Sequence, residues 1–528
     1  MFDQQRWPEV VEAISSVSAR DADLDYYLGV ALAQLGRFVQ ARRALLDGHR
    51  LRPHDKRFPT ELAGIAFKQK QYNEATRWMH IALRLDPTDD YSNDFLGTVY
   101  FLQGNLDAAL KYWNRANKPQ IRDVNENPQL TINPAILDHA FAFAPESVLR
   151  LRDLHTSESR LDGLGIFASY RFQLAARDDG NFDLVLRANE RNGWGVNKWD
   201  ALLSTFRGVF YQTIYLEYFN LHDSATNITS LIRWDAQKRR VQSAISGPLW
   251  SNPKFRYRAG VDLRNENWRI VPSFTGPAPL LGALNLRREA AFVSLTSFNS
   301  GRWDWSTSIE VSHRDYRSVF LGTALTSGLL VQGLQLKELA QIHVVPWRLP
   351  ERRLVTHAIV SEQLGRIWSS PSQSFLKLRS SVDGHWFPQQ QGDDFEMNER
   401  LLAGHTFGSP SFDELFMLGL ERDNDLPMRA HIGTRDGRKG SAPLGRTYFL
   451  SNWEINKNLY DAGLFRVRLS PFLDSGKITD PLPGLGSKRW LWDTGAQLKF
   501  GIFGMSLNFT YGKDLRSGAN AFYVTAQR

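Results

Sequence analysis

The sequence predicts a multidomain chain in which helical repeats and a small α/β module precede a C-terminal transmembrane antiparallel β-barrel of about sixteen strands. Three observations predict this arrangement. Residue types recur at a constant interval over positions 1–120, and a helix, strand, turn, strand pattern follows between 128 and 195. From 205 to 528 the chain consists of short segments in which polar and apolar residues alternate. We therefore expect three domains, at 1–120, 128–195 and 205–528.

The first part of the chain aligns with itself when it is shifted by the interval from Leu28 to Leu62, which is also the interval from Leu62 to Leu96. An interval of about 34 residues is typical of tetratricopeptide (TPR) repeats, where small residues let paired helices approach each other. Such repeats either present a concave surface to a peptide or act as a spacer, and both interpretations stay open. The residues that we expect to pack between helices are Leu28, Gly29, Ala41, Leu62, Ala75, Leu96, Gly97 and Ala109.

The N-terminus shows no signal peptide, because Met1 is followed at once by the polar, helix-like stretch FDQQRWPEVVEAISSV. This stretch is typical of the second helix of a repeat without its first helix. We therefore expect a truncated or processed N-terminus.

After a linker at 118–129, the pattern predicts a helix at 156–164 and strands at 168–176 and 182–189, joined by a tight turn at 178–181. The stretch 135–147 offers one strand. The helix ends in Leu164-Gly165-Ile166-Phe167, and this module resembles the second half of a POTRA domain, in which such a helix packs across a small sheet. The resemblance implies packing roles for Leu164, Gly165 and Phe167. A generic linker domain of two strands and one helix is the alternative.

Composition excludes several classes of protein. No apolar run is long enough for a spanning helix, which needs roughly 18 residues, and the mean hydropathy is −0.37. A transmembrane barrel stays compatible with these values, because its strands alternate between lipid-facing and lumen-facing residues. The net charge of +8 is scattered rather than gathered in a basic stripe, so we expect no nucleic-acid partner. The chain has no cysteine, and we expect no metal and no cofactor.

Sixteen segments after residue 205 have the alternation or the β-rich composition of strands, and turn signals separate them. An even number is the rule for bacterial single-chain barrels. The predicted strands are 210–220, 226–235, 239–246, 255–268, 288–298, 302–316, 328–346, 352–369, 373–388, 394–408, 413–422, 445–461, 463–478, 490–501, 505–514 and 520–528.

Three features of the last third of the chain occur together. A long loop at 423–444 contains Arg429, the predicted twelfth strand contains Glu454, and the predicted thirteenth strand contains Phe472-Leu473-Asp474-Ser475-Gly476. This combination resembles the superfamily of the BamA assembly factor, TamA and the two-partner secretion transporters, which is also called the bacterial surface antigen type. The resemblance covers residues 130–528.

The resemblance implies that the loop folds back into the barrel lumen and is locked there by Arg429. In that superfamily the loop arginine contacts the acid of a Phe-x-Asp-x-Gly motif, here Phe472, Asp474 and Gly476, near a glutamate, here Glu454. A guanidinium among carboxylates can form bidentate hydrogen bonds that fix a long loop. Three solvated charges without special contacts are the alternative.

Two departures from the superfamily pattern are visible. The glycine that usually follows the loop arginine is Ala430, and the usual aromatic residue is His431, which leaves the packing of the loop tip open. The C-terminus also lacks the terminal aromatic residue that is common in outer-membrane barrels.

The resemblance implies a Gram-negative outer-membrane protein with periplasmic N-terminal domains. These domains would recruit a polypeptide substrate, and the barrel would insert or translocate it among outer-membrane lipids. Accessory periplasmic or lipoprotein partners stay open. The alternative is a TPR-containing exopolysaccharide export porin, which would need neither the POTRA-like module nor the pairing of loop and strand motifs. We expect the chain to have no enzymatic activity, because no nucleophile elbow, phosphate loop or His-Glu-x-x-His motif occurs.

Overall fold

The computed structural model describes residues 1–271, 279–323, 325–389, 392–462, 465–502 and 505–527. Two compact units divide the chain. The first unit comprises residues 1–124, 145–151 and 173–184, and the second comprises residues 125–144, 152–172 and 185–528.

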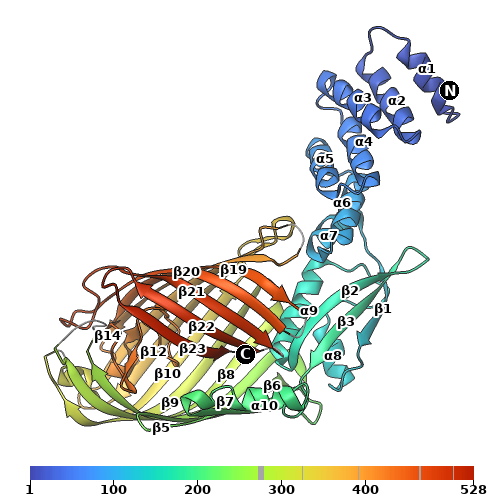
Figure 1. Ribbon diagram of the computed structural model, residues 1–528. Helices are drawn as coiled ribbons and strands as arrows, with labels where there is room; N and C mark the ends of the chain where they lie inside the picture. The colour runs from blue at the N-terminus through green and yellow to red at the C-terminus, as the bar shows by residue number, and fades with distance from the viewer. Residues whose placement is uncertain (272–278, 324, 390–391, 463–464, 503–504, 528) are drawn as a thin grey trace. The chain divides into compact units, whose positions relative to one another are not determined.

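Seven antiparallel helices form the fully described N-terminal part of the chain up to Trp113. Each helix packs against its neighbours in sequence order (Figure 1). The three helices α3, α5 and α7 begin at Phe38, Tyr72 and Leu106, so their starts are evenly spaced at the interval that the repeats predict. None of the described helices is long and apolar enough to cross a membrane. The bounds are α1 Trp7–Ser15, α2 Ala22–Gln34, α3 Phe38–Leu51, α4 Arg57–Lys68, α5 Tyr72–Leu85, α6 Asp90–Leu102 and α7 Leu106–Trp113.

The small residues at the repeat positions are buried where two helices touch. A Cβ on Gly29 would lie 2.5 Å from Leu45, and a Cβ on Gly97 would lie 2.2 Å from Trp113. These glycines are therefore required by close approach and not by backbone conformation. The eight residues expected to pack between helices, Leu28, Gly29, Ala41, Leu62, Ala75, Leu96, Gly97 and Ala109, are all buried.

The α/β module has more regular structure than the sequence predicted. Its elements are β1 Ile121–Asn127, α8 Pro134–Ala140, α9 Leu151–Leu164, β2 Phe167–Ala176 and β3 Phe182–Glu190, and the sheet order is β1-β3-β2.

Two predictions about this module are wrong. The expected linker contains β1, and the stretch expected to form a strand contains helix α8. Asn133 caps this helix by accepting a hydrogen bond from the Ala135 N–H, Pro134 fits its first turn, and Ile136 and Ala140 are buried on one face of the helix. The predicted helix at 156–164 is α9, which begins earlier, and the two strands lie where they were predicted.

The described strands between residues 213 and 527 form a closed barrel, in which successive wall strands along the chain pair antiparallel (Figure 1). Among the described residues, fifteen long strands form the wall, and three two-residue segments join the same sheet. The wall strands are β4 Thr213–Leu221, β5 Thr226–Asp235, β6 Lys238–Leu249, β7 Asn252–Ile270, β8 Gly282–Ser300, β9 Trp303–Phe320, β10 Gly333–Val344, β12 Leu354–Trp368, β13 Gln373–Trp386, β14 Phe395–Gly408, β19 Thr447–Asp461, β20 Phe465–Thr479, β21 Leu491–Ile502, β22 Met505–Asp514 and β23 Asn520–Gln527.

One of the sixteen predicted strands does not lie in the wall that the structure describes. Fifteen predicted strands overlap wall strands, but the segment 413–422 contains only β15 Phe416–Met417, which pairs with β18 Leu444–Gly445 in a separate two-stranded sheet. Phe416 and Leu418 alternate within this segment as they would in a strand, but they are buried against other residues of the barrel interior and not in the wall.

The odd number of described wall strands determines how the first and last of them, β4 and β23, meet at the seam of the barrel. Since each wall strand is antiparallel to the next, β4 and β23 run in the same direction. They are neighbours in the sheet order, and every other neighbouring pair of wall strands has a residue-by-residue register. No such register joins β4 to β23 within the described ranges.

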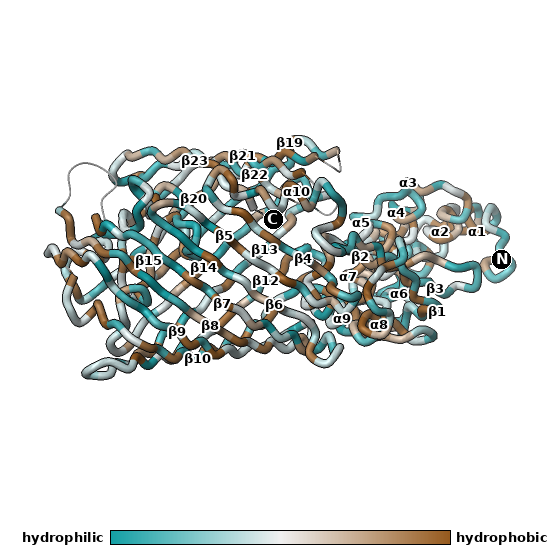
Figure 2. Tube along the Cα trace, turned by 90° about the horizontal axis from the view of Figure 1, so that it is seen from below, coloured by the Kyte–Doolittle hydropathy of each residue, from teal (hydrophilic) through white to brown (hydrophobic). Residues whose placement is uncertain are grey.

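Polar and apolar residues alternate along the wall strands, as Figure 2 shows by colour. On β7, Val261 and Leu263 are exposed on the outside, whereas Asp262 is buried and Arg264 is mostly covered inside. Because successive side chains of a strand point to opposite faces, the outer face is apolar and the inner face is polar. This is the reverse of a water-soluble barrel.

Candidate functional site

The interior of the barrel contains the loop that joins β14 to β19, residues 409–446, which we call the luminal loop. It is longer than the predicted loop at 423–444. Its side chains contact inward-facing residues of β5, β10, β13 and β20, which lie around the wall, so the loop occupies the lumen. Leu418, Leu426 and Met428 are almost fully buried and pack with apolar residues of the wall.

The structure brings Arg429 and Asp474 together at the tip of this loop. The Arg429 side chain donates from Nε to Asp474 Oδ2 at 2.9 Å and from Nη2 to Oδ1 at 2.6 Å, and its backbone N–H donates to Oδ2 at 3.0 Å. Asn452 Nδ2 donates to the same carboxylate at 2.8 Å. The side chain of Asp474 is 0% exposed and that of Arg429 is 10% exposed. The pair is therefore largely buried, and water screens it little.

Glu454 and Phe472 complete the surroundings of the guanidinium. Arg429 Nη1 donates to Glu454 Oε2 at 2.6 Å, and Lys499 contacts the other oxygen of Glu454. The guanidinium carbon lies 3.9 Å from the centre of the Phe472 ring, which is a close cation–π distance.

Gly476 makes room for the loop. A Cβ there would lie 3.0 Å from Leu418 and 3.1 Å from the Phe449 carbonyl. The last residue of the Phe-x-Asp-x-Gly motif therefore faces the luminal loop, and a larger residue would push against it.

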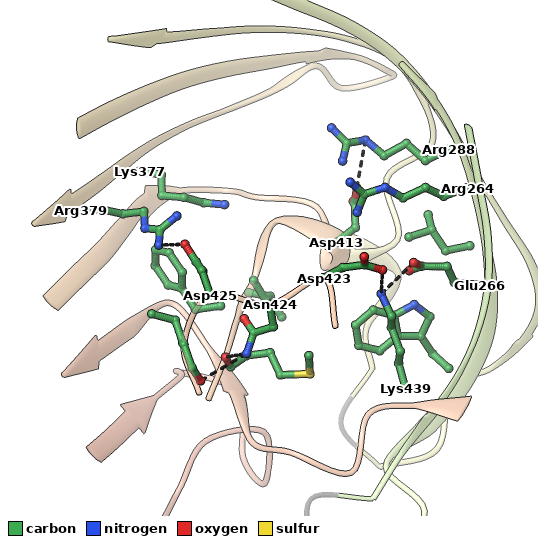
Figure 3. A pocket seen from close by; sticks show the side chains of 16 residues that line it. Arg264, Glu266, Arg288, Lys377, Arg379, Asp413, Asp423, Asn424, Asp425 and Lys439 are labelled. Atoms are coloured by element: carbon green, nitrogen blue, oxygen red, sulfur yellow. Dashed lines mark hydrogen bonds and ion pairs between the residues drawn. The ribbon is translucent and has the colours of Figure 1, made fainter. Parts of the chain in front are cut away.

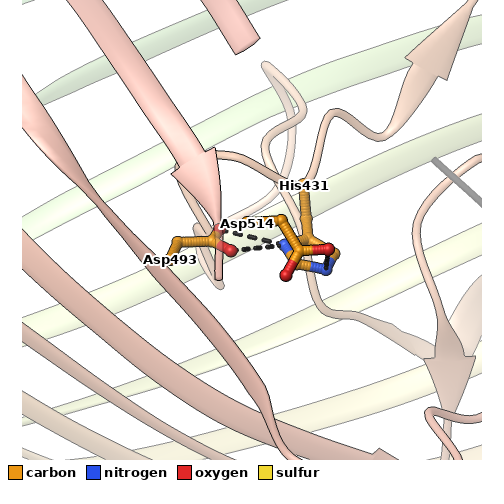
Figure 4. Close-up of side chains that lie close together, drawn as sticks. All are labelled: His431, Asp493 and Asp514. Atoms are coloured by element: carbon orange, nitrogen blue, oxygen red, sulfur yellow. Dashed lines mark hydrogen bonds and ion pairs between the residues drawn. The ribbon is translucent and has the colours of Figure 1, made fainter. Parts of the chain in front are cut away.

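The two residues that depart from the superfamily pattern make polar contacts of their own. The backbone N–H of Ala430 donates to Asp493 Oδ2 at 2.7 Å, and His431 Nδ1 lies 2.8 Å from Asp493 Oδ1 (Figure 4). His431 Nε2 lies 3.8 Å from Asp514. The tip is thus bound to β21 and β22 as well as to β20.

His431, Asp493 and Asp514 are also the one group of three acidic or histidine side chains in the described ranges that is close enough to hold a metal ion. The two carboxylates, however, lie against different nitrogens of the imidazole ring. A single ion would need them on the same side of the ring. The geometry therefore fits a histidine that bridges two acids better than a metal centre.

A second set of contacts, which the sequence analysis missed, holds the part of the luminal loop before its tip, residues 413–425, which we call the first limb. Glu414 lies at its centre and accepts hydrogen bonds from Lys337 Nζ at 3.1 Å, Lys377 Nζ at 3.0 Å and Gln335 Nε2 at 3.2 Å. The neighbouring Asp413 lies 2.9 Å from Arg314 Nη1. Both carboxylates are nearly fully buried.

Further along the same limb, Asp423 accepts from Arg233 at 2.8 Å and from Arg240 at 2.6 Å. Lys439, on the returning limb, lies between Asp423 and Glu266 and closes this cluster (Figure 3). The residues in Figure 3 border a cavity of about 170 Å³ between loop and wall.

Acidic and basic side chains are therefore separated along the luminal loop. Its first limb is acidic and meets basic side chains of β5, β6, β9, β10 and β13, whereas its tip is basic and meets acids of β19 to β22. The acid-rich stretches at 413–414 and 421–425 were the available sequence signal for the first limb. The partners could not be identified from the sequence, because they lie up to 190 residues away.

The structure also shows the surroundings of the three residues expected to pack in the α/β module. Leu164 is buried, and Gly165 has a φ of +69°, a conformation that favours glycine. Phe167 is half-buried and lies edge-on to Tyr170. Asn227 of β5 donates to the carbonyl of Leu164 at 2.9 Å, so this turn is tied to the barrel.

Comparisons with known proteins find likenesses among solved structures. No protein-family model and no curated protein matches the chain. Similar solved structures include BamA from Haemophilus ducreyi lacking POTRA domains 1–3, with 12% identity, a TM-score of 0.45 and coverage of 77% of this chain and 84% of that one. CdiB from Escherichia coli has 13% identity, a TM-score of 0.48 and coverage of 78% and 75%. CdiB from Acinetobacter baumannii has 12% identity, a TM-score of 0.45 and coverage of 88% and 85%.

Proposed function

We propose that this chain is an outer-membrane protein that assembles or translocates polypeptides. The observation that supports this most is the luminal loop, whose arginine meets the acid of the Phe-x-Asp-x-Gly motif inside a barrel. That contact is the one implied by the resemblance to the BamA, TamA and two-partner secretion superfamily. The roles of Arg429, Asp474 and Glu454 as a loop lock are part of this proposal.

The apolar outer face supports a position in a lipid bilayer. Large apolar side chains on this face, such as Val293, Ile309, Ile342 and Val360, are more than half exposed, with exposures of 51–61%. In water such a surface would be a continuous apolar patch around the barrel. In a bilayer it contacts lipid, and the antiparallel ladders leave most of the wall's backbone groups paired inside the sheet.

The seam offers the barrel a place to receive a substrate. Wherever β4 and β23 are not joined by a ladder, each has an edge that can pair with another strand. An unfolded polypeptide can add to such an edge by β-augmentation. We propose that the seam acts in this way while the luminal loop keeps the lumen closed.

The N-terminal parts fit the recruitment of a polypeptide before it reaches the barrel. We propose that residues 1–120 are TPR repeats and that residues 128–195 are a POTRA-like module, both periplasmic. The even spacing of the helix starts at Phe38, Tyr72 and Leu106 supports the first assignment. A helix that ends in Leu164-Gly165 before a three-stranded sheet supports the second.

Depletion of the protein in its own host tests the function. We expect loss of particular outer-membrane or secreted polypeptides, restored by the wild-type chain and not by Asp474→Ala. Asp383→Ala is the matched control, because Asp383 is an inward acid that pairs with Arg400 of the wall at 3.0 Å. An unchanged set of polypeptides together with loss of a surface polysaccharide would contradict the proposal and favour the export porin.

A further inference from the structure

The helix between the α/β module and the first wall strand, α10 Lys198–Phe206, has its polarity reversed. Its apolar residues Trp199, Leu202 and Phe206 follow at helical spacing and are 65%, 48% and 48% exposed. Its polar residues Asp200 and Ser204 are only 4% and 2% exposed. A helix on a water-soluble surface buries its apolar face and exposes its polar face. This reversal is expected where the surroundings are lipid.

The buried polar face is satisfied within the same segment. Asp200 accepts from the Val196 N–H at 2.9 Å and from Ser204 Oγ at 3.3 Å, and Asn197 caps the helix by accepting from the Asp200 N–H at 2.9 Å. Because these groups are paired, the helix can keep its polar side against the protein at little cost.

The segment that contains α10 is bound to β4 at both ends. Gly193 and Phe219 exchange two backbone hydrogen bonds, at 3.0 and 2.7 Å, and the Thr213 N–H donates to the Gly208 carbonyl at 3.0 Å. Between these points, Arg207 donates to both oxygens of Glu217, at 2.7 and 3.1 Å. Its guanidinium also lies 3.8 Å from the centre of the Tyr215 ring.

These bonds identify the edge that the segment occupies. Successive residues of a strand direct their N–H and C=O groups to opposite edges. Thr213 and Phe219, both odd-numbered, bond to the segment, so the even-numbered residues between them face β5. The segment therefore lies along the other edge of β4, which is the edge at the seam. In Figure 1, α10 lies at the margin of the barrel.

We propose that α10 is a lipid-embedded cap on the seam edge of β4. The partner of its exposed face is the headgroup and acyl boundary of the bilayer, continuous with the apolar outer face of the wall. A cap of this kind protects the edge from unwanted pairing, and it can move away within the lipid when an incoming strand pairs with β4. The inference rests on the proposed function, because it requires the barrel to span a bilayer.

Single cysteines test the lipid contact, since the chain has no cysteine of its own. Leu202→Cys, Val293→Cys on the outer face of β8 and Val39→Cys on α3 each carry the fluorophore NBD in the full chain. The protein is reconstituted in phosphatidylcholine vesicles with or without a lipid bearing a doxyl quencher on its acyl chain. We expect quenching of Leu202→Cys to match that of Val293→Cys, while Val39→Cys keeps its fluorescence.

The other outcomes are distinguishable. Quenching at Val293→Cys without quenching at Leu202→Cys would show that α10 faces water and would overturn the cap alone. No quenching at either position would overturn the bilayer position of the barrel, and with it both the proposed function and the cap.

Hydrogen exchange of backbone amides tests whether the segment that contains α10 stabilises the edge of β4. In Arg207→Ala the amides of Thr213 and Phe219 should exchange about tenfold faster, because a hydrogen-bonded ion pair is lost. Lys198→Ala, an exposed change on the same helix, is the matched control and should leave these rates unchanged. Equal exchange in both variants would mean that α10 does not hold this edge.

Discussion

Replacement of Asp474 by alanine is the most direct perturbation of the luminal loop. The carboxylate receives four hydrogen bonds from Arg429 and one from Asn452, at 2.6 to 3.2 Å, and it is fully buried. The alanine leaves a largely buried cationic side chain with one of its two acidic partners missing. We therefore expect the loop tip to leave its position more often, while the wall strands stay paired.

The size of the effect follows from burial. Removal of one partner from a buried ion pair costs about 3–5 kcal/mol. Arg429 keeps Glu454 at 2.6 Å and is partly accessible, so the lower end of this range applies. A cost of about 3 kcal/mol raises the population of the undocked tip roughly 100-fold, since each 1.4 kcal/mol is a factor of ten.

A buried cysteine reports that population. Ser441 is 4% exposed, and its hydroxyl donates to the Ile432 carbonyl near the tip. In Ser441→Cys a maleimide reaches the thiol only when the loop opens, so the labelling rate follows the open fraction. We expect the rate to rise roughly 100-fold with Asp474→Ala and to stay unchanged with Asp383→Ala. Equal rates in the two variants would refute the reasoning that the tip is locked by this pair.

Two further predictions concern the first limb and the repeats. Glu414→Gln removes the acid that Lys337 and Lys377 share, and only Lys337 keeps another acid among the described residues, Glu310 at 3.2 Å. The first limb should loosen and channel conductance in planar bilayers should rise, and an unchanged conductance would exclude this role. In residues 1–120 expressed alone, Gly97→Ala pushes a Cβ into the tryptophan of α7 and should cost about 1–3 kcal/mol, which lowers the midpoint of thermal unfolding by at least about 4 °C. The matched change Gly64→Ala, in α4 with open space around it, should raise the midpoint, and a fall of equal size in both would contradict the packing argument.

Local periodicity was enough to predict much of the fold. The helix starts at 38, 72 and 106 follow from the repeat spacing, and fifteen wall strands follow from alternation and turn residues. Alternation failed at 413–422, because it shows that one face of a segment is buried but not what buries it. A loop that folds onto the inside of the wall gives the same pattern as a strand of the wall.

Some contacts of the candidate site could likewise be predicted from the sequence, and others could not. The position of Arg429 opposite Asp474 and Glu454 could be predicted, because the resemblance supplied the pairing. The contacts of Glu414 and Asp423 could not, since each depends on the register of several strands that are distant in sequence. The full burial of Asp474 also needed the structure, because it depends on how the loop tip packs against the wall.

The separation of acidic and basic side chains along the luminal loop determines how it can move. The first limb is held by lysines and arginines around Glu414 and Asp423, and the tip is held by acids around Arg429 and His431, with no partner residue shared among the contacts described. A change at one end therefore leaves the ion pairs of the other end intact. Asp474→Ala should free the tip while the first limb stays in the lumen, and Glu414→Gln should do the reverse. Withdrawal of the whole loop therefore requires both sets of ion pairs to separate.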